Sequence, residues 1–382
     1  MDFFFDWYLW MFPLLGFFAI ILTSNKKKYS LEHNTIDSSF NSNSIEEYRV
    51  SKFFAIIVFL AMILIAGFRD RWYADTTAYV YMFEEWPNKL SEVFLTGEER
   101  YPGFLYFTVF IKQYISTDFR VWLVIIATIS ISCLALTYRK YTSEIVLCAF
   151  LFFSSTDFQA WTMNGIRQFL VVSILFALTP LLFKNRLFGY IIFIVFGLIL
   201  YYFHVSVLIT LPIYFLALGK PLNKKTITIM ILIVLAITFL DQFTNLMSDV
   251  IENTSYKSSV TEIVSNVDGG TNIFRVLFYS MPTIFFIIFR HRIPDDIPDI
   301  IKYSMNMSMV GSAFYLLSFF TSGIFLGRIP IYFTLFNYIL IPWEINNLVK
   351  QENKKLVYYA LIIMYLVFYI YQQYTWNSGI IL

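Results

Sequence analysis

The sequence predicts an all-α integral membrane protein, and three observations support this class. Of the 382 residues, 58% are hydrophobic and only 14% are charged, whereas a soluble domain carries about 25% charged residues. Phe (43 residues) and Tyr (27 residues) are very frequent, which suits lipid-facing surfaces and interfacial aromatic belts. The apolar runs lack the alternation of a β-barrel, and a helix in lipid satisfies its own backbone hydrogen bonds. We therefore expect residues 1–382 to form one polytopic helical domain.

Apolar runs that could cross a bilayer recur along the whole chain. A spanning helix needs about 17–25 residues, and several runs need flanking residues to reach that length. The pattern predicts about 12 transmembrane helices. The expected spans are Trp7–Ser24, Phe53–Phe68, Val121–Tyr138, Ile145–Phe158, Phe169–Phe183, Leu187–Phe203, Val205–Leu218, Thr226–Leu240, Val276–Phe289, Tyr303–Phe320, Ile329–Ile345 and Leu356–Gln372.

Basic residues in the loops orient the predicted bundle. Most of the 28 lysines and arginines fall in loops that alternate along the chain. With both termini outside, all these loops face the cytoplasm, as the positive-inside rule requires. They include a cytoplasmic connector at residues 25–52. The basic residues are Lys26, Lys27, Lys28, Arg49, Lys52, Arg139, Lys140, Lys184, Arg186, Lys220, Lys224, Lys225, Arg290, Arg292, Lys302, Lys350, Lys354 and Lys355.

The run Pro102–Ile115 decides this orientation, because it is apolar and aromatic and could itself be a span. If it crossed the membrane, every later basic loop would face outwards, against the positive-inside rule. Lys112 and Gln113 near its end give it an amphipathic character. We therefore expect a helix that lies at the outer interface or re-enters from it.

A second set of charged residues lies at the outer ends of the spans, in or near two expected outer loops at 69–120 and 241–273. Cations on this side run against the positive-inside rule and need another explanation. A membrane enzyme that handles an anionic, lipid-linked substrate on its outer face would supply one. The set comprises Arg69, Arg71, Asp75, Glu98, Glu99, Arg100, Arg167, His204 and Arg328.

Four arginines of this set are candidates for binding a diphosphate. A planar guanidinium binds phosphate oxygens in pairs, and Arg69 and Arg71 follow the second span directly. Arg167 is expected near a helix N-terminus, where the backbone field favours anions, and Arg328 precedes the eleventh span. The structural alternatives are an interfacial salt-bridge cluster and a snorkelling arginine. Because charges at a membrane edge are costly, function is favoured for Arg167.

Asp75 and His204 are the two candidates for a catalytic base. Asp75 could equally orient an arginine, and a lone histidine is more often a satisfied structural group. Glu98, Glu99 and Arg100 end the first outer loop and could contact an acceptor, although charged loop residues are usually only solvated. The sequence contains no His/Asp cluster at metal-ligand spacing. No cofactor is expected, since the arginines make a metal unnecessary, and a divalent metal stays an open alternative.

Members of the charged set belong to five motifs that follow one another along the chain: Gly67-x-Arg69, Asp75-Thr76-x-x-Tyr79, Arg167-Gln168, His204-x-Ser206 and Arg328 before Tyr332-Phe333. Together these motifs resemble the EpsG family of polysaccharide polymerases. The resemblance covers most of the chain, and its motifs lie on one expected face. The family is grouped with Wzy-type polymerases, and its bundle resembles the GT-C glycosyltransferase fold. That fold has interfacial helices in its early outer loops, and the segment Pro102–Ile115 would match such a helix. Asp70 beside Asp75 departs from the pattern and leaves open which carboxylate matters.

The resemblance implies glycosyl transfer on the outer face of a bacterial cytoplasmic membrane. The donor would be a polyprenyl-diphosphate-linked glycan, and the acceptor a sugar hydroxyl of another lipid-linked repeat unit. The product would be a surface polysaccharide such as O-antigen, capsule or exopolysaccharide. Tyr79 and Gln168 become further candidates for substrate contacts. The expected partners are the lipid bilayer, a chain-length regulator and a flippase, and no nucleic acid.

Two other classes of membrane protein compete with this interpretation. A flippase for lipid-linked oligosaccharide also needs outer cations, but it should show repeat symmetry and charges on both sides of a cavity. A membrane acyltransferase would pair its histidine with Asn or Asp beside an acyl-donor tunnel. The confinement of the unusual charges to one side favours the polymerase.

Overall fold

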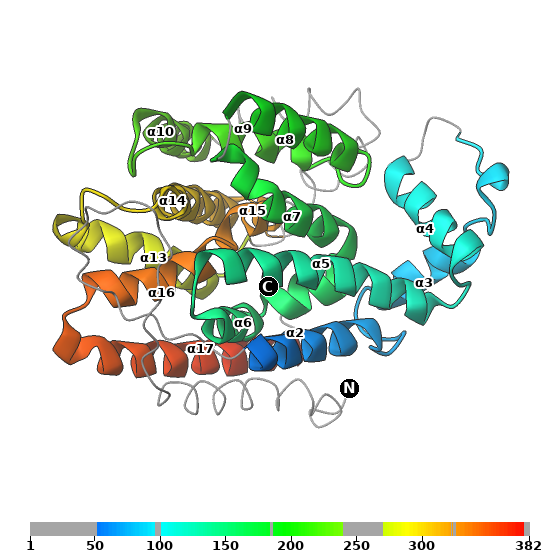
Figure 1. Ribbon diagram of the computed structural model, residues 1–382, viewed down its shortest axis with the longest axis horizontal. Coiled ribbons are helices and arrows are strands. Elements are labelled where there is room, and N and C mark those ends of the chain that lie inside the picture. The colour runs from blue at the N-terminus through cyan, green and yellow to red at the C-terminus, as the bar shows by residue number, and fades with distance from the viewer. Residues whose placement is uncertain are drawn as a thin grey trace, which may run out of the picture.

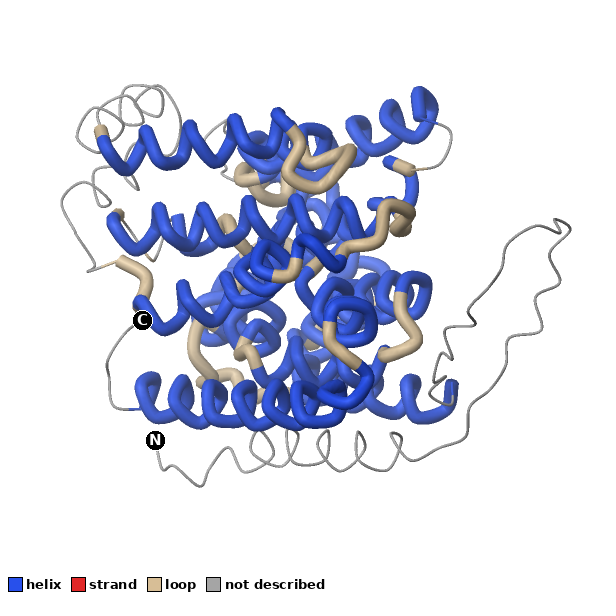
Figure 2. Tube along the Cα trace, turned by 90° about the vertical axis from the view of Figure 1, so that its left-hand side faces the viewer, coloured by secondary structure: helices blue, strands red, loops and turns tan. Residues whose placement is uncertain are grey.

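The computed structural model describes residues 52–95, 101–183, 186–239, 270–321, 323 and 326–377. These residues form helices and contain no strand, which confirms the predicted all-helical class (Figures 1 and 2). The predicted span Trp7–Ser24 and nearly all of the connector 25–52 lie outside this part of the chain.

The first half of the bundle is built on α5 (Phe119–Tyr141), which packs against both α2 (Lys52–Gly67) and α7 (Ile166–Leu178). Asp118 caps α5 by accepting a hydrogen bond from the Arg120 N–H at 2.8 Å, which satisfies a backbone donor of the first turn. A Cβ at Gly67 would lie 2.5 Å from Cγ2 of Val124. Glycine therefore permits the close approach of α2 to α5 beside the outer loop.

The second half of the bundle surrounds α14 (Asp299–Phe320), whose side chains are buried along most of its length. On it pack α10 (Lys224–Thr238), α13 (Ile273–Ile288), α15 (Ile331–Thr334) and α16 (Asn337–Leu348). The remaining elements are α6 (Ile145–Ser154), α8 (Arg186–Tyr201), α9 (Val207–Leu216), α17 (Lys354–Asn377), the π-helix η2 (Phe158–Asn164), and the 3₁₀ turns η1 (Leu90–Glu92), η3 (Thr179–Leu182), η4 (Arg290–Arg292), η5 (Leu326–Arg328) and η6 (Gln351–Asn353).

The number of spans differs from the expectation of about 12. In the part of the chain described, Phe119–Tyr141 and Gln351–Thr375 are long and apolar enough to cross a membrane, and the other apolar helices are shorter. The predicted span Ile145–Phe158 is broken, since α6 and η2 meet at an angle of 80°. The predicted span Ile329–Ile345 is divided between α15 and α16. The described helices are therefore consistent with a membrane protein, but the count of about 12 spans is not confirmed.

Two helices, α3 (Thr76–Glu85) and α4 (Pro102–Tyr114), project from one end of the molecule (Figure 1). The helix predicted for Pro102–Ile115 is present as α4. The Nζ of Lys112 donates hydrogen bonds to the carbonyls of Phe83, at 2.8 Å, and Trp86, which tie α4 to α3. The turns from α13 to α14 and from α16 to α17 lie at the opposite end (Figure 1). The basic turns and the candidate site residues on α3 are thus at opposite ends of the bundle.

Candidate functional site

Segments far apart in the sequence meet around the ring of Tyr101, the residue before α4. The Cζ of Arg167, in the first turn of α7, lies 4.0 Å from the centre of this ring and 5.5 Å from that of Tyr79 on α3. The Tyr101 ring also stacks on His204, with 5.6 Å between ring centres and 17° between planes. Tyr101 therefore contacts both the predicted diphosphate-binding arginine and the predicted base, although the sequence did not identify it.

Close packing at Gly103 holds Tyr101 in this position. The Gly103 N–H donates to the carbonyl of Tyr202 at 2.9 Å, two residues before His204. A Cβ at Gly103 would lie 2.9 Å from side-chain atoms of Tyr202 and Phe203. Glycine thus allows the start of α4 to lie directly against the turn between α8 and α9 that carries His204.

The second arginine of the site, Arg328, reaches it from η5. The Gln168 side chain is buried, and its Nε2 donates to the carbonyl of Arg328 at 2.8 Å, which joins η5 to the start of α7. The Arg328 side chain is exposed. Its charge and that of Arg167 both act on Tyr79 and on His204. The structure therefore brings together Tyr79, Arg167, Gln168, His204 and Arg328 from the predicted set.

Within the described part of the chain, no acidic side chain neutralises the positive charge of the two arginines of this cluster. Among the residues that the structure describes, neither Arg167 nor Arg328 forms an ion pair, and the Nε of Arg167 is buried without a hydrogen-bond partner. Arg167 also lies in the first turn of α7, where the backbone N–H groups favour negative charge. Such an arrangement suits a ligand with several anionic oxygens, such as a diphosphate.

His204 starts a chain of hydrogen bonds that runs into the bundle. Its Nδ1 lies 2.7 Å from the Ser206 Oγ, which lies 2.7 Å from the hydroxyl of Tyr332 on α15. The backbone N–H of Ser206 also donates to Nδ1, at 3.4 Å. When Nδ1 accepts that bond, the neutral ring carries its proton on Nε2. In this tautomer His204 presents an N–H donor, rather than a lone pair, on the side of the ring away from Ser206.

The surroundings of His204 keep its ring neutral. The residue lies in the turn between α8 and α9, outside the helices. Burial lowers the pKa of His204 to about 3, and the charges of Arg167 and Arg328 lower it further in the same direction. Burial raises the pKa of Tyr79, against the opposing charge of Arg167, and the Asp75 charge adds to the rise. Both groups thus stay uncharged at neutral pH and act as hydrogen-bonding groups.

Asp75 lies at the edge of this cluster. Its backbone N–H donates to the Asn164 Oδ1 at 2.9 Å, which joins the start of α3 to the end of η2. Its carboxylate is exposed and makes no capping hydrogen bond to α3. The preceding residue, Ala74, has a φ of 45°, an unfavourable conformation for a residue with a Cβ. The chain is therefore held in a tight turn that leaves the Asp75 carboxylate accessible and within electrostatic range of Tyr79.

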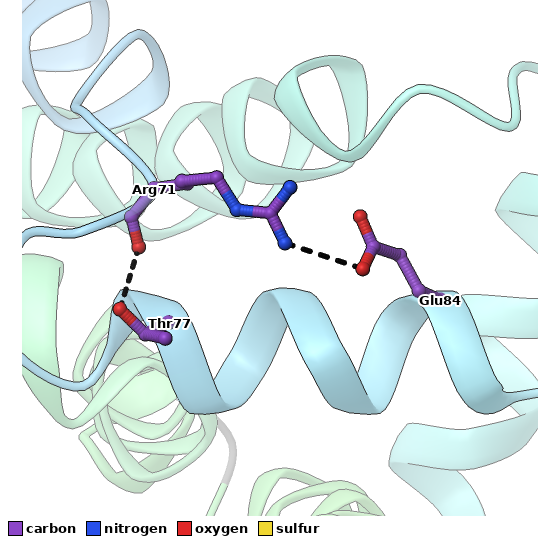
Figure 3. A network of polar contacts seen from close by, with 3 residues as sticks. All are labelled: Arg71, Thr77 and Glu84. Carbon is purple, nitrogen blue, oxygen red and sulfur yellow. Dashed lines mark hydrogen bonds and ion pairs between the residues drawn. The ribbon is translucent and has the colours of Figure 1, made fainter.

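Arg69 braces the start of α3, and Arg71 lies on another face of α3 from the pair Arg167 and Arg328, here called the cation cluster. Arg69 is buried, and it donates to the Thr76 Oγ1 at 2.7 Å and to the carbonyl of Ala66, so it braces the link between α2 and α3. Arg71 forms an ion pair of 3.3 Å with Glu84, while the Thr77 hydroxyl donates to its carbonyl (Figure 3). Glu84 and Tyr79 are five residues apart, which places them about 140° apart around the helix. Arg71 therefore occupies a different face of α3 from Tyr79.

The last predicted loop contacts, Glu98, Glu99 and Arg100, fall outside the residues that the structure describes. Within the described residues, no group of three His, Cys, Asp or Glu side chains could hold a metal ion.

One buried carboxylate near the site was missed by the sequence interpretation. Asp157 lies at the break between α6 and η2 and is fully buried. It accepts hydrogen bonds from the hydroxyls of Tyr279, at 2.5 Å, and Tyr338, at 2.6 Å. The adjacent Thr156 has a φ of 71°. An acidic residue inside an apolar run was the signal that could have identified it, because such residues are costly in a membrane.

The Asp157 cluster supports the site from inside the bundle. The η2 helix that follows Asp157 ends at Asn164, which holds the backbone of Asp75. On the same helix, the Gln159 Nε2 donates to the Tyr73 hydroxyl at 3.3 Å. Two side-chain contacts therefore connect η2 to the outer loop that carries Asp75.

Comparison with known proteins gives one match. The model of the EpsG family matches residues 52–381, which is nearly the whole chain. No curated protein and no solved structure matches the chain.

Proposed function

Because the chain belongs to the EpsG family, which is associated with polysaccharide polymerases, we propose that it joins lipid-linked repeat units into a polysaccharide. At the level of the family, it is a membrane protein of polysaccharide biosynthesis. The proposed donor is a polyprenyl-diphosphate-linked oligosaccharide, and the proposed acceptor is a sugar hydroxyl of another such unit. The proposed location is the outer face of a bacterial cytoplasmic membrane.

The pair of Arg167 and Arg328, which forms no ion pair with the residues that the structure describes, carries this proposal. The two residues come from helices far apart in the sequence, yet both charges act on Tyr79 and His204. A diphosphate provides the several anionic oxygens that two guanidinium groups bind best. The positive-inside rule explains the lysines and arginines of the basic turns at the opposite end of the bundle. It does not explain Arg167 and Arg328.

In the proposed reaction, the acceptor hydroxyl attacks the anomeric carbon of the donor. The new C–O bond forms as the bond from that carbon to the diphosphate oxygen breaks, and the electron pair leaves with the diphosphate. The proton of the hydroxyl passes to a base. Negative charge develops on the leaving diphosphate, so fixed positive groups lower the barrier by stabilising the transition state more than the substrate.

The hydrogen bonds of His204 support different tasks for the two candidate bases. Its Nδ1 accepts from Ser206, so the Nε2–H can donate to a diphosphate oxygen and the ring cannot take up the acceptor's proton in this tautomer. Asp75 has an exposed carboxylate near the cluster. We therefore propose Asp75 as the general base and His204 as a neutral donor to the leaving group.

Polymer formation in a strain that lacks the chromosomal copy tests the proposal. Arg167→Ala and Arg328→Ala should each lower the rate by about 10²–10³-fold, the usual cost of losing one preorganised group at a developing charge. Arg→Lys at either position should restore little, because a point charge cannot bind two oxygens at once. Single lipid-linked repeat units should accumulate on the outer face, measured by accessibility to an added glycosidase.

Arg71→Ala is the matched control, because Arg71 lies at the same end of the bundle but pairs with Glu84 on another face of α3. It should leave the polymer ladder and the protein level near those of wild type. Repeat units trapped on the cytoplasmic face of the Arg167→Ala strain would support a flippase instead. Normal polymer from both Arg167→Ala and Arg328→Ala would refute the polymerase mechanism.

A further inference from the structure

A cavity away from the cation cluster contains a carboxyl group that has no role in the proposed polymerisation mechanism. It lies between α13, α16 and α17 and has a volume of about 190 Å³. Glu344 on α16 is its one charged lining residue, and the others are apolar, among them Pro282, Phe285, Ala360 and Leu361. The Glu344 side chain is only 3% exposed, and within the described part of the chain its Oε1 has no hydrogen-bond partner.

Two prolines inside helices explain why the packing is open at this level. Pro282 lies within α13 and lines the cavity, and Pro342 lies within α16, two residues before Glu344. Proline removes a backbone hydrogen bond, and its ring clashes with the preceding turn of the helix. The two helices therefore cannot pack with uniform close contact here, and space remains between them and α17.

The lining determines what kind of molecule fits. A buried water needs two to four polar partners, and this cavity offers one carboxyl group. An aliphatic chain matches the apolar wall, since an apolar cavity of about 150 Å³ binds a molecule the size of benzene. A carboxyl group among apolar side chains is stable when it is protonated and hydrogen-bonded. The ligand should therefore carry a hydrogen-bond acceptor at one end of an aliphatic chain.

Positive charge lies one helical turn from Glu344. Leu348 is four residues further along α16, about 6 Å by the rise of the helix, and its carbonyl accepts a hydrogen bond from Arg292 at 3.0 Å. Lys354 begins α17, three residues before Val357, which lines the cavity. An amphiphile whose chain enters the cavity would thus place its head group beside two cations.

We propose that this cavity binds one acyl chain of an anionic diacyl phospholipid. The ester carbonyl accepts a hydrogen bond from Glu344, and the phosphate lies beside Arg292 and Lys354. The site is separate from the polymerisation site, and the proposal does not depend on the function proposed above.

Native mass spectrometry of the full chain in detergent, with added phosphatidylglycerol, measures the lipid that the protein retains. Glu344→Leu and Ala360→Phe should each lower the retention of the tightest lipid at least tenfold, because one removes the donor and the other fills the cavity. Glu344→Gln should retain it, since the amide still donates. The matched control is Ile363→Phe, also on α17, at a position 57% exposed and outside the cavity lining. Arg292→Ala should reduce the preference for phosphatidylglycerol over phosphatidylcholine.

A second measurement uses the unmodified protein. A protonated carboxyl group in an apolar site adds to dicyclohexylcarbodiimide: its oxygen bonds to the central carbon as one C=N π bond breaks, and its proton passes to that nitrogen. The O-acylisourea then rearranges by an O-to-N acyl shift to a stable N-acylurea, which is found by peptide mass spectrometry. Glu344 should be labelled, and phosphatidylglycerol should slow the labelling. Equal labelling with and without the lipid, or retention by Ala360→Phe and Glu344→Leu equal to that of wild type, would overturn the proposal.

Discussion

The guanidinium of Arg167 lies over the ring of Tyr101, with 4.0 Å between its Cζ and the ring centre. A cation held on an aromatic face is attracted to the ring quadrupole but keeps its full charge. The ring therefore fixes Arg167 in place without neutralising it, whereas a carboxylate partner would cancel its charge. This arrangement keeps the charge ready for an anionic ligand.

Tyr101→Leu should weaken substrate binding and slow polymer formation, because it removes the surface on which both Arg167 and His204 rest. The expected loss is about 2–30-fold, from a cation–π contact of about 0.5–2 kcal/mol. Tyr101→Phe keeps the ring and should stay near wild type. The initial rate on lipid-linked repeat units in membranes measures the effect, with Tyr114→Leu, at an exposed residue of α4, as the control. Equal rates for Tyr101→Leu and Tyr101→Phe would contradict this role of the ring.

Ser206→Ala should uncouple His204 from Tyr332, because the Ser206 hydroxyl lies 2.7 Å from both partners. The ring then keeps the backbone N–H contact to Nδ1 but loses the hydroxyl that holds its orientation, so kcat should fall about 10-fold or more while KM changes little. Tyr332→Phe should have a smaller effect of the same kind. Steady-state kinetics of both variants distinguish this role from simple packing, which would lower the amount of folded protein and leave the kcat of the remainder unchanged.

The neutral state of His204 predicts how stability depends on pH. Its pKa is lowered to about 3 in the folded protein, against about 6.5 in an unfolded chain. The stabilisation that results is fully present above pH 6.5 and is lost as pH falls, because the unfolded state takes up the proton first. At pH 5 the loss should be about 2 kcal/mol.

Thermal unfolding of the purified protein at pH 7.5 and pH 5 measures this loss. His204→Asn lacks the titrating group, so its stability should fall less than that of wild type over this range. The same pH dependence of stability in both proteins would contradict a lowered pKa, because His204 would then take up its proton at pH 5 in the folded state as well.

Tyr338→Phe should destabilise the protein, because it leaves the buried Asp157 carboxylate with one donor fewer. The hydroxyl lies 2.6 Å from the Asp157 Oδ2 and 2.6 Å from the Ser155 Oγ, and an unsatisfied buried acceptor costs about 1–3 kcal/mol. Tyr374→Phe, at an exposed residue of α17, should be neutral. Equal thermal midpoints for Tyr338→Phe and Tyr374→Phe would show that the Asp157 cluster does not stabilise the break between α6 and η2.

The sequence was least informative where partners come from distant segments. The run Ile145–Phe158 is apolar enough to predict a span, but Asp157 takes its hydrogen bonds from Tyr279 and Tyr338. These residues lie more than a hundred positions further along the chain, so the local pattern of the run could not indicate them. Their hydrogen bonds to Asp157 stabilise the break in the helix inside the bundle.

The sequence by itself determined the helical membrane class, the α4 helix and the separation of the candidate site from the basic turns. Composition, apolar runs and loop charges are local properties, and a membrane acts on each of them segment by segment. Only the tertiary structure decided which candidate arginines lie near the same groups. Function was favoured for Arg167 over Arg71 from the sequence, but only the structure pairs Arg71 with Glu84 and holds Arg167 over the rings of Tyr79 and Tyr101. The reason is geometric. The packing of the whole chain decides which direction each side of a helix faces and which other helix packs against it.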